Sequence, residues 1–117
     1  MQDYRQLYVW QKAHKLAVDT YSLGEYFRRP EAWKLRDQIF DAVVSIPSNI
    51  AEGSGRGSNA DFKRFLWYSN GSCNEFEGDV LLARDVNFLP EQIHTRLGEQ
   101  VEEVRRMLTS FIDKVGA

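Results

Sequence analysis

The sequence predicts an all-α fold: an up-down-up-down antiparallel four-helix bundle with a proline-kinked second helix. Apolar residues recur every three or four positions through four separate segments, which is the period of a helix. No stretch shows the alternation between turn signals that predicts a β-hairpin. The connections are short, about three to six residues, so neighbouring helices must run antiparallel. A chain of 117 residues fits one domain, spanning residues 1–117.

The first helix is predicted over residues 5–27. Its apolar stripe consists of Leu7, Trp10, His14, Ala17 and Tyr21, and it is widened by Val9, Ala13, Leu16 and Leu23. These residues step by three and four and therefore share one helix face, so we expect His14 to lie in the core. Arg28-Arg29-Pro30 ends the helix, because the residue before a proline resists helical geometry.

The second helix is predicted to begin at Pro30, because proline suits the first helical turn. Its core stripe consists of Leu35, Ile39, Ala42, Ile46 and Ile50. Pro47 interrupts this pattern, so the helix either ends there or kinks and continues. We favour a kink because the apolar period persists to Ile50, and we expect Gly53 to stop the helix.

The third and fourth helices have clear starting signals. Residues 58–61, with the sequence Ser-Asn-Ala-Asp, have the form of a capping box, and an apolar period follows from residue 62 to residue 83. Residues 90–91, Pro-Glu, open the fourth helix. The apolar stripe of the fourth helix is Ile93, Leu97, Val101, Val104, Leu108, Phe111 and Val115.

Composition restricts the function classes. The formal net charge is −2, whereas a nucleic-acid binder usually carries a basic surplus. Cys73 is the single cysteine, so an intramolecular disulfide is impossible and a reducing compartment is the simpler expectation. The chain shows no secretory leader and no apolar run of about 18 residues, so we expect a cytoplasmic protein without membrane contact.

A nine-residue segment carries a family resemblance. Residues 45–53 read Ser-Ile-Pro-Ser-Asn-Ile-Ala-Glu-Gly, which resembles the signature of the bacterial rRNA intervening-sequence proteins. The matching motif positions are Ser45, Pro47, Asn49, Glu52 and Gly53. Flanking matches within residues 7–16, 61–66 and 71–75 extend the resemblance to about residues 5–110.

The resemblance implies a compact bundle that assembles, characteristically as a pentameric ring. It brings no established enzymatic activity. The accessory protein of diversity-generating retroelements is similar in fold, and it is a basic pentamer that binds nucleic acid and a reverse transcriptase. This chain departs from that protein because it is mildly acidic.

The motif itself has two interpretations. Ser45, Asn49 and Glu52 recur at helical spacing and would form a polar binding groove beside the glycine-rich turn. Alternatively, the serine and asparagine bond carbonyls that the proline leaves free, which is the structural interpretation we favour. The turn over residues 53–58 would cradle a phosphate at a helix N-terminus, but a plain reversal that uses the positive φ of glycine is favoured.

Two helix faces predict an oligomer interface. On the second helix, Trp33, Phe40 and Val44 lie off the core stripe, so this helix is apolar nearly all round and needs a second surface to cover it. On the third helix, the outer face is formed by Trp67, Gly71 and Gly78. Two glycines on a helix face allow another helix to approach closely. The alternative is that these are tolerated surface residues.

The sequence predicts no catalytic, cofactor or metal site and no small-molecule substrate. His14 and His94 are the only histidines and have no partner at metal-ligand spacing, and Cys73 is expected to be buried and inert. We therefore expect a homo-oligomeric binding or adaptor module whose assembled surface contacts a partner, either another protein or a nucleic acid. The alternative is nucleic-acid binding by the assembled oligomer. The candidate phosphate contacts are Arg28, Arg29, Lys34 and Arg36.

Overall fold

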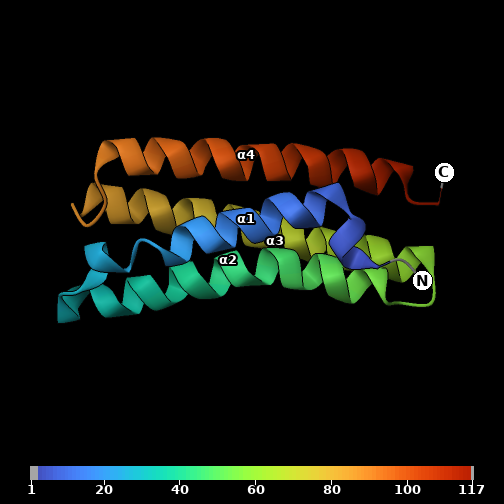
Figure 1. Ribbon diagram of the computed structural model, residues 1–117, viewed down its shortest axis with the longest axis horizontal. Helices are drawn as coiled ribbons and strands as arrows, with labels where there is room; N and C mark the ends of the chain where they lie inside the picture. Colours follow the sequence, from blue (N-terminus) through green and yellow to red (C-terminus); the bar gives the residue numbers. More distant parts are fainter. Residues whose placement is uncertain (1–2, 117) are drawn as a thin grey trace.

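Four helices lie side by side along the long axis of the molecule in a computed structural model that describes residues 3–116 (Figure 1). They are α1 (Tyr8–Tyr21), α2 (Trp33–Ser54), α3 (Asn59–Asp85) and α4 (Glu91–Lys114). Within residues 3–116 the structure contains helices and turns but no strand. The predicted four-helix bundle is confirmed, and both chain ends lie at the same end of it (Figure 1).

The first helix is shorter than predicted. Instead of running over residues 5–27, α1 ends at Tyr21, and short 3-10 turns occupy Tyr4–Gln6, Gly24–Phe27 and Pro30–Ala32. The Ser22 hydroxyl donates to the Asp19 carbonyl (2.6 Å), and the Leu23 amide donates to the Thr20 carbonyl (3.0 Å). These bonds satisfy carbonyls that a continuing helix would use, so the chain turns across the end of the bundle instead.

The core face of α1 lies on the widened side of the predicted stripe, at Val9, Ala13 and Leu16. The buried residues of this helix are Val9, Ala13, Leu16, Ala17 and Thr20. His14 is exposed and stacks on Trp10 with ring centroids 4.7 Å apart, so the expectation of a core histidine is wrong. The helix has two apolar stripes side by side, and the smaller side chains occupy the core because they allow α1 to approach its neighbours.

The second helix continues through Pro47 to Ser54, as predicted. The predicted stripe from Leu35 to Ile50 is buried. The expected role of Gly53 is wrong, because this glycine lies inside the helix and does not stop it. A Cβ at Gly53 would stand 2.8 Å from the Cβ of Phe65 on α3, so the glycine allows two helices to pack closely.

The backbone conformations of the loops differ from those predicted. No glycine in the turn over residues 53–58 has a positive φ; Gly55, the C-cap of α2, has φ −91°. At the start of α3, Ser58 accepts the Asp61 amide at 3.2 Å, which is the capping bond expected there. The other end of α3 carries the left-handed residue, Asn87, with φ 67°.

Candidate interaction surfaces

An apolar groove runs between α1 and α2. It has a volume of about 510 Å³, and its lining includes His14 but no Asp, Glu, Lys or Arg. We call it the α1–α2 groove; its main apolar lining residues are Trp10, Ala17, Val18, Tyr21, Val44 and Pro47. Val18 and Tyr21 are 56% and 54% exposed. Large apolar side chains therefore remain in contact with water along a continuous trough.

Aromatic stacking holds the walls of this groove in place. Tyr4 packs edge-on against Trp10 with centroids 5.1 Å apart, and Tyr21 stacks on Phe40 at 4.4 Å. Phe40 also meets the buried Phe27 edge-on at 6.4 Å. Such contacts fix ring orientations, so the groove is formed before anything occupies it.

The predicted interface residues of α2 differ in their exposure and in their neighbours. Val44 lines the groove and is 40% exposed, whereas Phe40 is half-buried against the core. Trp33 is exposed at the first residue of α2, where its indole N–H donates to the Arg28 carbonyl (3.2 Å). The guanidinium of Arg36 lies 5.7 Å from the Trp33 ring centroid. The structure brings Phe40 and Val44 toward one surface but leaves Trp33 apart from the groove lining.

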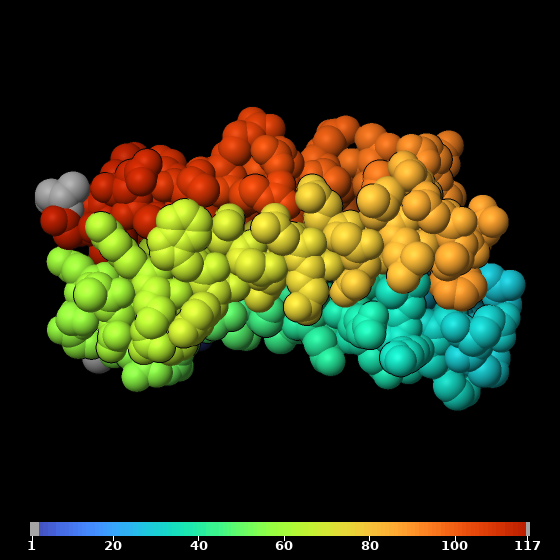
Figure 2. Space-filling view, turned by 180° about the vertical axis from the view of Figure 1, so that it is seen from behind, coloured from blue at the N-terminus to red at the C-terminus, as the bar shows by residue number. Residues whose placement is uncertain are grey.

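A second exposed apolar surface lies on α3, which crosses the middle of the face seen from behind in Figure 2. We call it the α3 ridge: Trp67, Gly71, Gly78 and Leu82. Trp67 is 52% and Leu82 49% exposed. A Cβ at Gly71 or Gly78 would meet nothing within 4 Å. Spacings of four, seven and four place these residues on one helix face.

The residues of the nine-residue motif join α2 to α3. The Ser45 hydroxyl bonds to the Ala42 carbonyl (2.9 Å) and lies within hydrogen-bond distance of the Ser72 hydroxyl on α3. Asn49 donates to the Ser45 carbonyl at 2.8 Å. Within the described residues no motif side chain bonds the Val43 carbonyl, which is the one that Pro47 leaves free. The Ser45–Ser72 contact joins α2 to α3, whereas the bonds of Ser45 and Asn49 to backbone carbonyls stay within α2 and do not use the carbonyl that we expected.

The acidic and glycine positions of the motif are also engaged within the chain. Glu52 pairs with Arg56 at 2.8 Å, and the Arg56 guanidinium covers the Phe65 ring at 4.6 Å. Gly53 is buried against α3. Because Arg56 is already paired, the turn does not present a free cation to a phosphate.

The basic residues near the α1–α2 connection are partly neutralised. Arg29 pairs with Glu31 at 3.5 Å, and Arg36 pairs with Asp37 at 3.0 Å. The other two candidate phosphate contacts, Arg28 and Lys34, are exposed and form no ion pair within residues 3–116.

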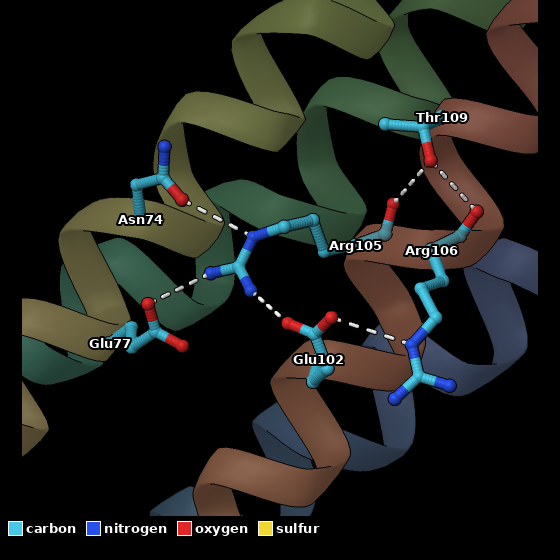
Figure 3. Close-up of polar contacts among 6 residues, drawn as sticks. All are labelled: Asn74, Glu77, Glu102, Arg105, Arg106 and Thr109. Carbon is cyan, nitrogen blue, oxygen red and sulfur yellow. Dashed lines mark hydrogen bonds and ion pairs between the residues drawn. The ribbon is translucent and has the colours of Figure 1, made fainter.

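A polar cluster between α3 and α4 was not anticipated (Figure 3). Arg105 donates to Asn74 at 3.2 Å, pairs with Glu77 at 3.1 Å and also pairs with Glu102. Glu102 in turn reaches Arg106 at 3.4 Å. The signal for this contact was the pair Asn74 and Glu77, which share a face of α3 at i, i+3 spacing.

The titratable groups of residues 3–116 include no metal-holding cluster, and the thiol among them is buried. No group of three or more His, Cys, Asp or Glu residues is placed to hold a metal ion in residues 3–116. Cys73 is buried, and this burial raises the pKa of its thiol to about 12. The thiolate, which is the nucleophile, is therefore scarce near neutral pH. None of the described helices is long and apolar enough to cross a membrane.

Comparisons with known proteins agree with this architecture. The sequence model of a family described as 23S rRNA-intervening sequence protein matches residues 5–110. A solved crystal structure from Bacteroides thetaiotaomicron, of a protein with unknown function from the S23 ribosomal protein family, has a similar fold with a TM-score of 0.84. The two sequences are 24% identical, and the match covers 89% of this chain and 97% of the other. No curated protein matches the chain.

Proposed function

This chain belongs to the 23S rRNA-intervening sequence protein family, and from that premise we propose that it is a non-enzymatic module that assembles with copies of itself. The assembled surface then binds a partner protein, so the module acts as an adaptor. The α1–α2 groove is the observation that supports this proposal, because apolar side chains dominate its lining and three of them, Val18, Tyr21 and Val44, are exposed. The number of copies follows the resemblance to the family, which implies a ring of five.

Physical chemistry favours covering such a groove. Water-exposed apolar area contributes roughly 25 cal/mol per Å² when it is buried, and soluble monomers rarely expose contiguous apolar patches above a few hundred Å². The stacked aromatic walls lose little conformational freedom on binding, because they are already ordered. This preorganisation lowers the entropic cost of association. The buried, unreactive Cys73 suits a reducing compartment, and we place the assembly in the cytoplasm.

The mass in solution tests the proposal directly. Light scattering after gel filtration at micromolar concentration measures absolute mass without assuming a shape. Five copies of a 13.6 kDa chain give about 68 kDa (5 × 13.6). A mass near 13.6 kDa over this concentration range would overturn the proposal of self-assembly.

Nucleic-acid binding by the assembled oligomer is the second candidate. Two exposed cations without an ion pair in the described chain, Arg28 and Lys34, support it, because a ring would repeat them in every copy. Fluorescence anisotropy with labelled RNA and duplex DNA at two salt concentrations tests this idea. We expect binding that weakens with salt and is lost in Arg28→Glu/Lys34→Glu. Binding that is absent, or that salt does not change, contradicts it.

A further inference from the structure

We propose that the N-terminal 3-10 turn, Tyr4–Gln6, is a self-docked strap that closes one end of the α1–α2 groove. The turn lies against both α1 and α2, and Figure 1 shows it crossing from the start of α1 toward α2. The ring of Tyr4 is the part of the turn that lines the groove. The inference rests on the proposed function in one respect, that the groove receives a binding partner, and it adds a contact that limits this binding.

Tyr4 stands where the groove would otherwise continue along α2. A second hollow of about 510 Å³ adjoins the groove and reaches Arg56 in the turn after α2. The two hollows share three lining residues: Tyr4, Ser48 and Ala51. Ser48 and Ala51 lie three residues apart on α2 and form a common floor, so Tyr4 is the shared residue that comes from outside this helix. Displacing its ring would therefore join the two hollows into one longer trough.

The strap is held to the bundle by contacts that can open. The turn contains no buried residue, and Tyr4 itself is only half-buried. It is fixed to α1 by the edge-on packing of Tyr4 on Trp10, with centroids 5.1 Å apart, and by a hydrogen bond that the Gln11 side chain donates to the Arg5 carbonyl at 2.9 Å. This hydrogen bond is exposed to solvent. Elements with few buried contacts and exposed hydrogen bonds open at low free energy.

Leu7 provides the hinge of the strap. Its backbone is extended, with φ −76° and ψ 122°, directly before α1, and its side chain packs against the core. The turn can therefore swing on Leu7 while α1 stays in place. The wall at the opposite end of the groove behaves differently, because Tyr21 belongs to α1 itself and stacks on Phe40, which packs against the core.

The strap therefore acts as an autoinhibitory contact. A partner segment that fills the whole trough must take the place of the Tyr4 ring, so its apparent affinity is reduced in proportion to the fraction of molecules in which the strap is open. A change that loosens the strap raises this affinity without adding any contact to the partner. Gln11 offers such a change, because its side chain holds the strap but does not line the groove.

Binding of the fluorescent dye 1-anilinonaphthalene-8-sulfonate, which binds exposed apolar surface, tests the strap without a partner. Gln11→Ala removes the bond to the Arg5 carbonyl and leaves the side chains that line the groove unchanged. Loss of one such bond weakens the closed state by roughly twofold to tenfold, and we expect the dye to bind more tightly by up to that factor. Tyr4→Ala removes the ring and should raise the affinity at least as much. Adding Val18→Glu, which places a charge in the groove, should cancel both increases.

Tyr68→Ala is the matched control, because Tyr68 is an exposed tyrosine on α3 that lines neither hollow, and this variant should bind the dye like the wild type. Circular dichroism and a cooperative thermal melt establish that each variant folds, and Gln11→Ala decides the test if Tyr4→Ala does not fold. The inference is overturned if Gln11→Ala binds the dye no better than the wild type, if its increase persists with Val18→Glu, or if Tyr68→Ala raises binding equally. The dye results do not depend on assembly, so a wild type that stays at 13.6 kDa overturns the proposed self-assembly and not the strap.

Discussion

Replacing Gly53 by alanine places a methyl group between α2 and α3 at a point where the two helices pack closely. The new Cβ would lie 2.8 Å from the Cβ of Phe65, 2.9 Å from a ring carbon of Phe62 and 3.2 Å from the Phe62 carbonyl oxygen. A side-chain rotation can move the ring carbon. It cannot move the Phe65 Cβ or the carbonyl oxygen, which are fixed to the backbone of α3.

Two opposing terms set the size of the effect. Alanine favours a helix interior over glycine by about 1 kcal/mol. Overpacking a tight contact costs about 1–3 kcal/mol, and the upper end applies because relieving the contact requires α3 to move by several tenths of an ångström. The free energy of unfolding should therefore fall by about 2 kcal/mol. For a chain of this length that lowers the melting temperature by about 8 °C.

Urea denaturation followed by circular dichroism measures this change. The matched control is Gly98→Ala, because Gly98 also lies inside a helix but a Cβ there would meet nothing within 4 Å. We expect the control to gain up to about 1 kcal/mol, since only helix propensity acts on it. A Gly53→Ala protein as stable as the wild type, with the control behaving as expected, would refute the close-packing account.

Three further changes test other parts of the structure. Cys73 should not react with a thiol reagent at pH 8 in the native protein and should react fully in urea, because burial raises its pKa to about 12; rapid native labelling contradicts this. Arg105→Met should lower the free energy of unfolding by about 1–2 kcal/mol, measured in urea, and a neutral result would show that its contacts with α3 do not stabilise the fold. A hydrogen bond from Lys15, and a smaller contribution from Gln100, lower the pKa of Asp19 in the folded protein. The ionised Asp19 therefore stabilises the fold at pH values above its unfolded-state pKa of about 3.8, and this stabilisation is lost as pH falls through the lower folded-state pKa. Asp19→Asn should therefore be less stable than wild type at pH 7, by under about 1 kcal/mol. The gap in urea midpoints between the two proteins should narrow as pH falls below the unfolded value of 3.8; a gap independent of pH contradicts the assignment.

Periodicity predicted the parts of the fold in which one stripe faces one core. The stripe from Leu35 to Ile50 and the α4 positions from Leu97 to Leu108 follow the sequence pattern, since helical spacing determines which residues share a face. Near the end of α4 the pattern predicted Phe111, whereas Ile112 is the buried residue. In α1 two apolar stripes lie side by side, and spacing cannot tell which one faces inward. The smaller residues went to the core and His14 stayed outside, because the packing of three other helices decides that choice.

The candidate surfaces were less predictable for a related reason. Val44 and Trp67 were recognised as surplus apolar residues, and both are exposed. The α1 side of the groove was missed, because Val18 and Tyr21 become groove walls only once α1 is placed beside α2. Gly53 was misassigned for the same reason. A glycine near the end of a helical pattern resembles a helix stop signal, and the close contact of Gly53 with α3 is known only once the neighbouring helix is placed.

Both chain ends leave the bundle from the same end, and this has a mechanical consequence (Figure 1). A pulling force applied between the two ends would act across the short dimension of the molecule, about 20 Å, and not along its length of 46 Å. The load would fall on one helical turn of α1 or α4 at a time, so the outer helices would peel away in sequence. We expect low unfolding forces in a single-molecule experiment. A molecule clamped by α2 and α3, for example through cysteines placed at opposite ends of this pair, would resist by shear and yield at higher force.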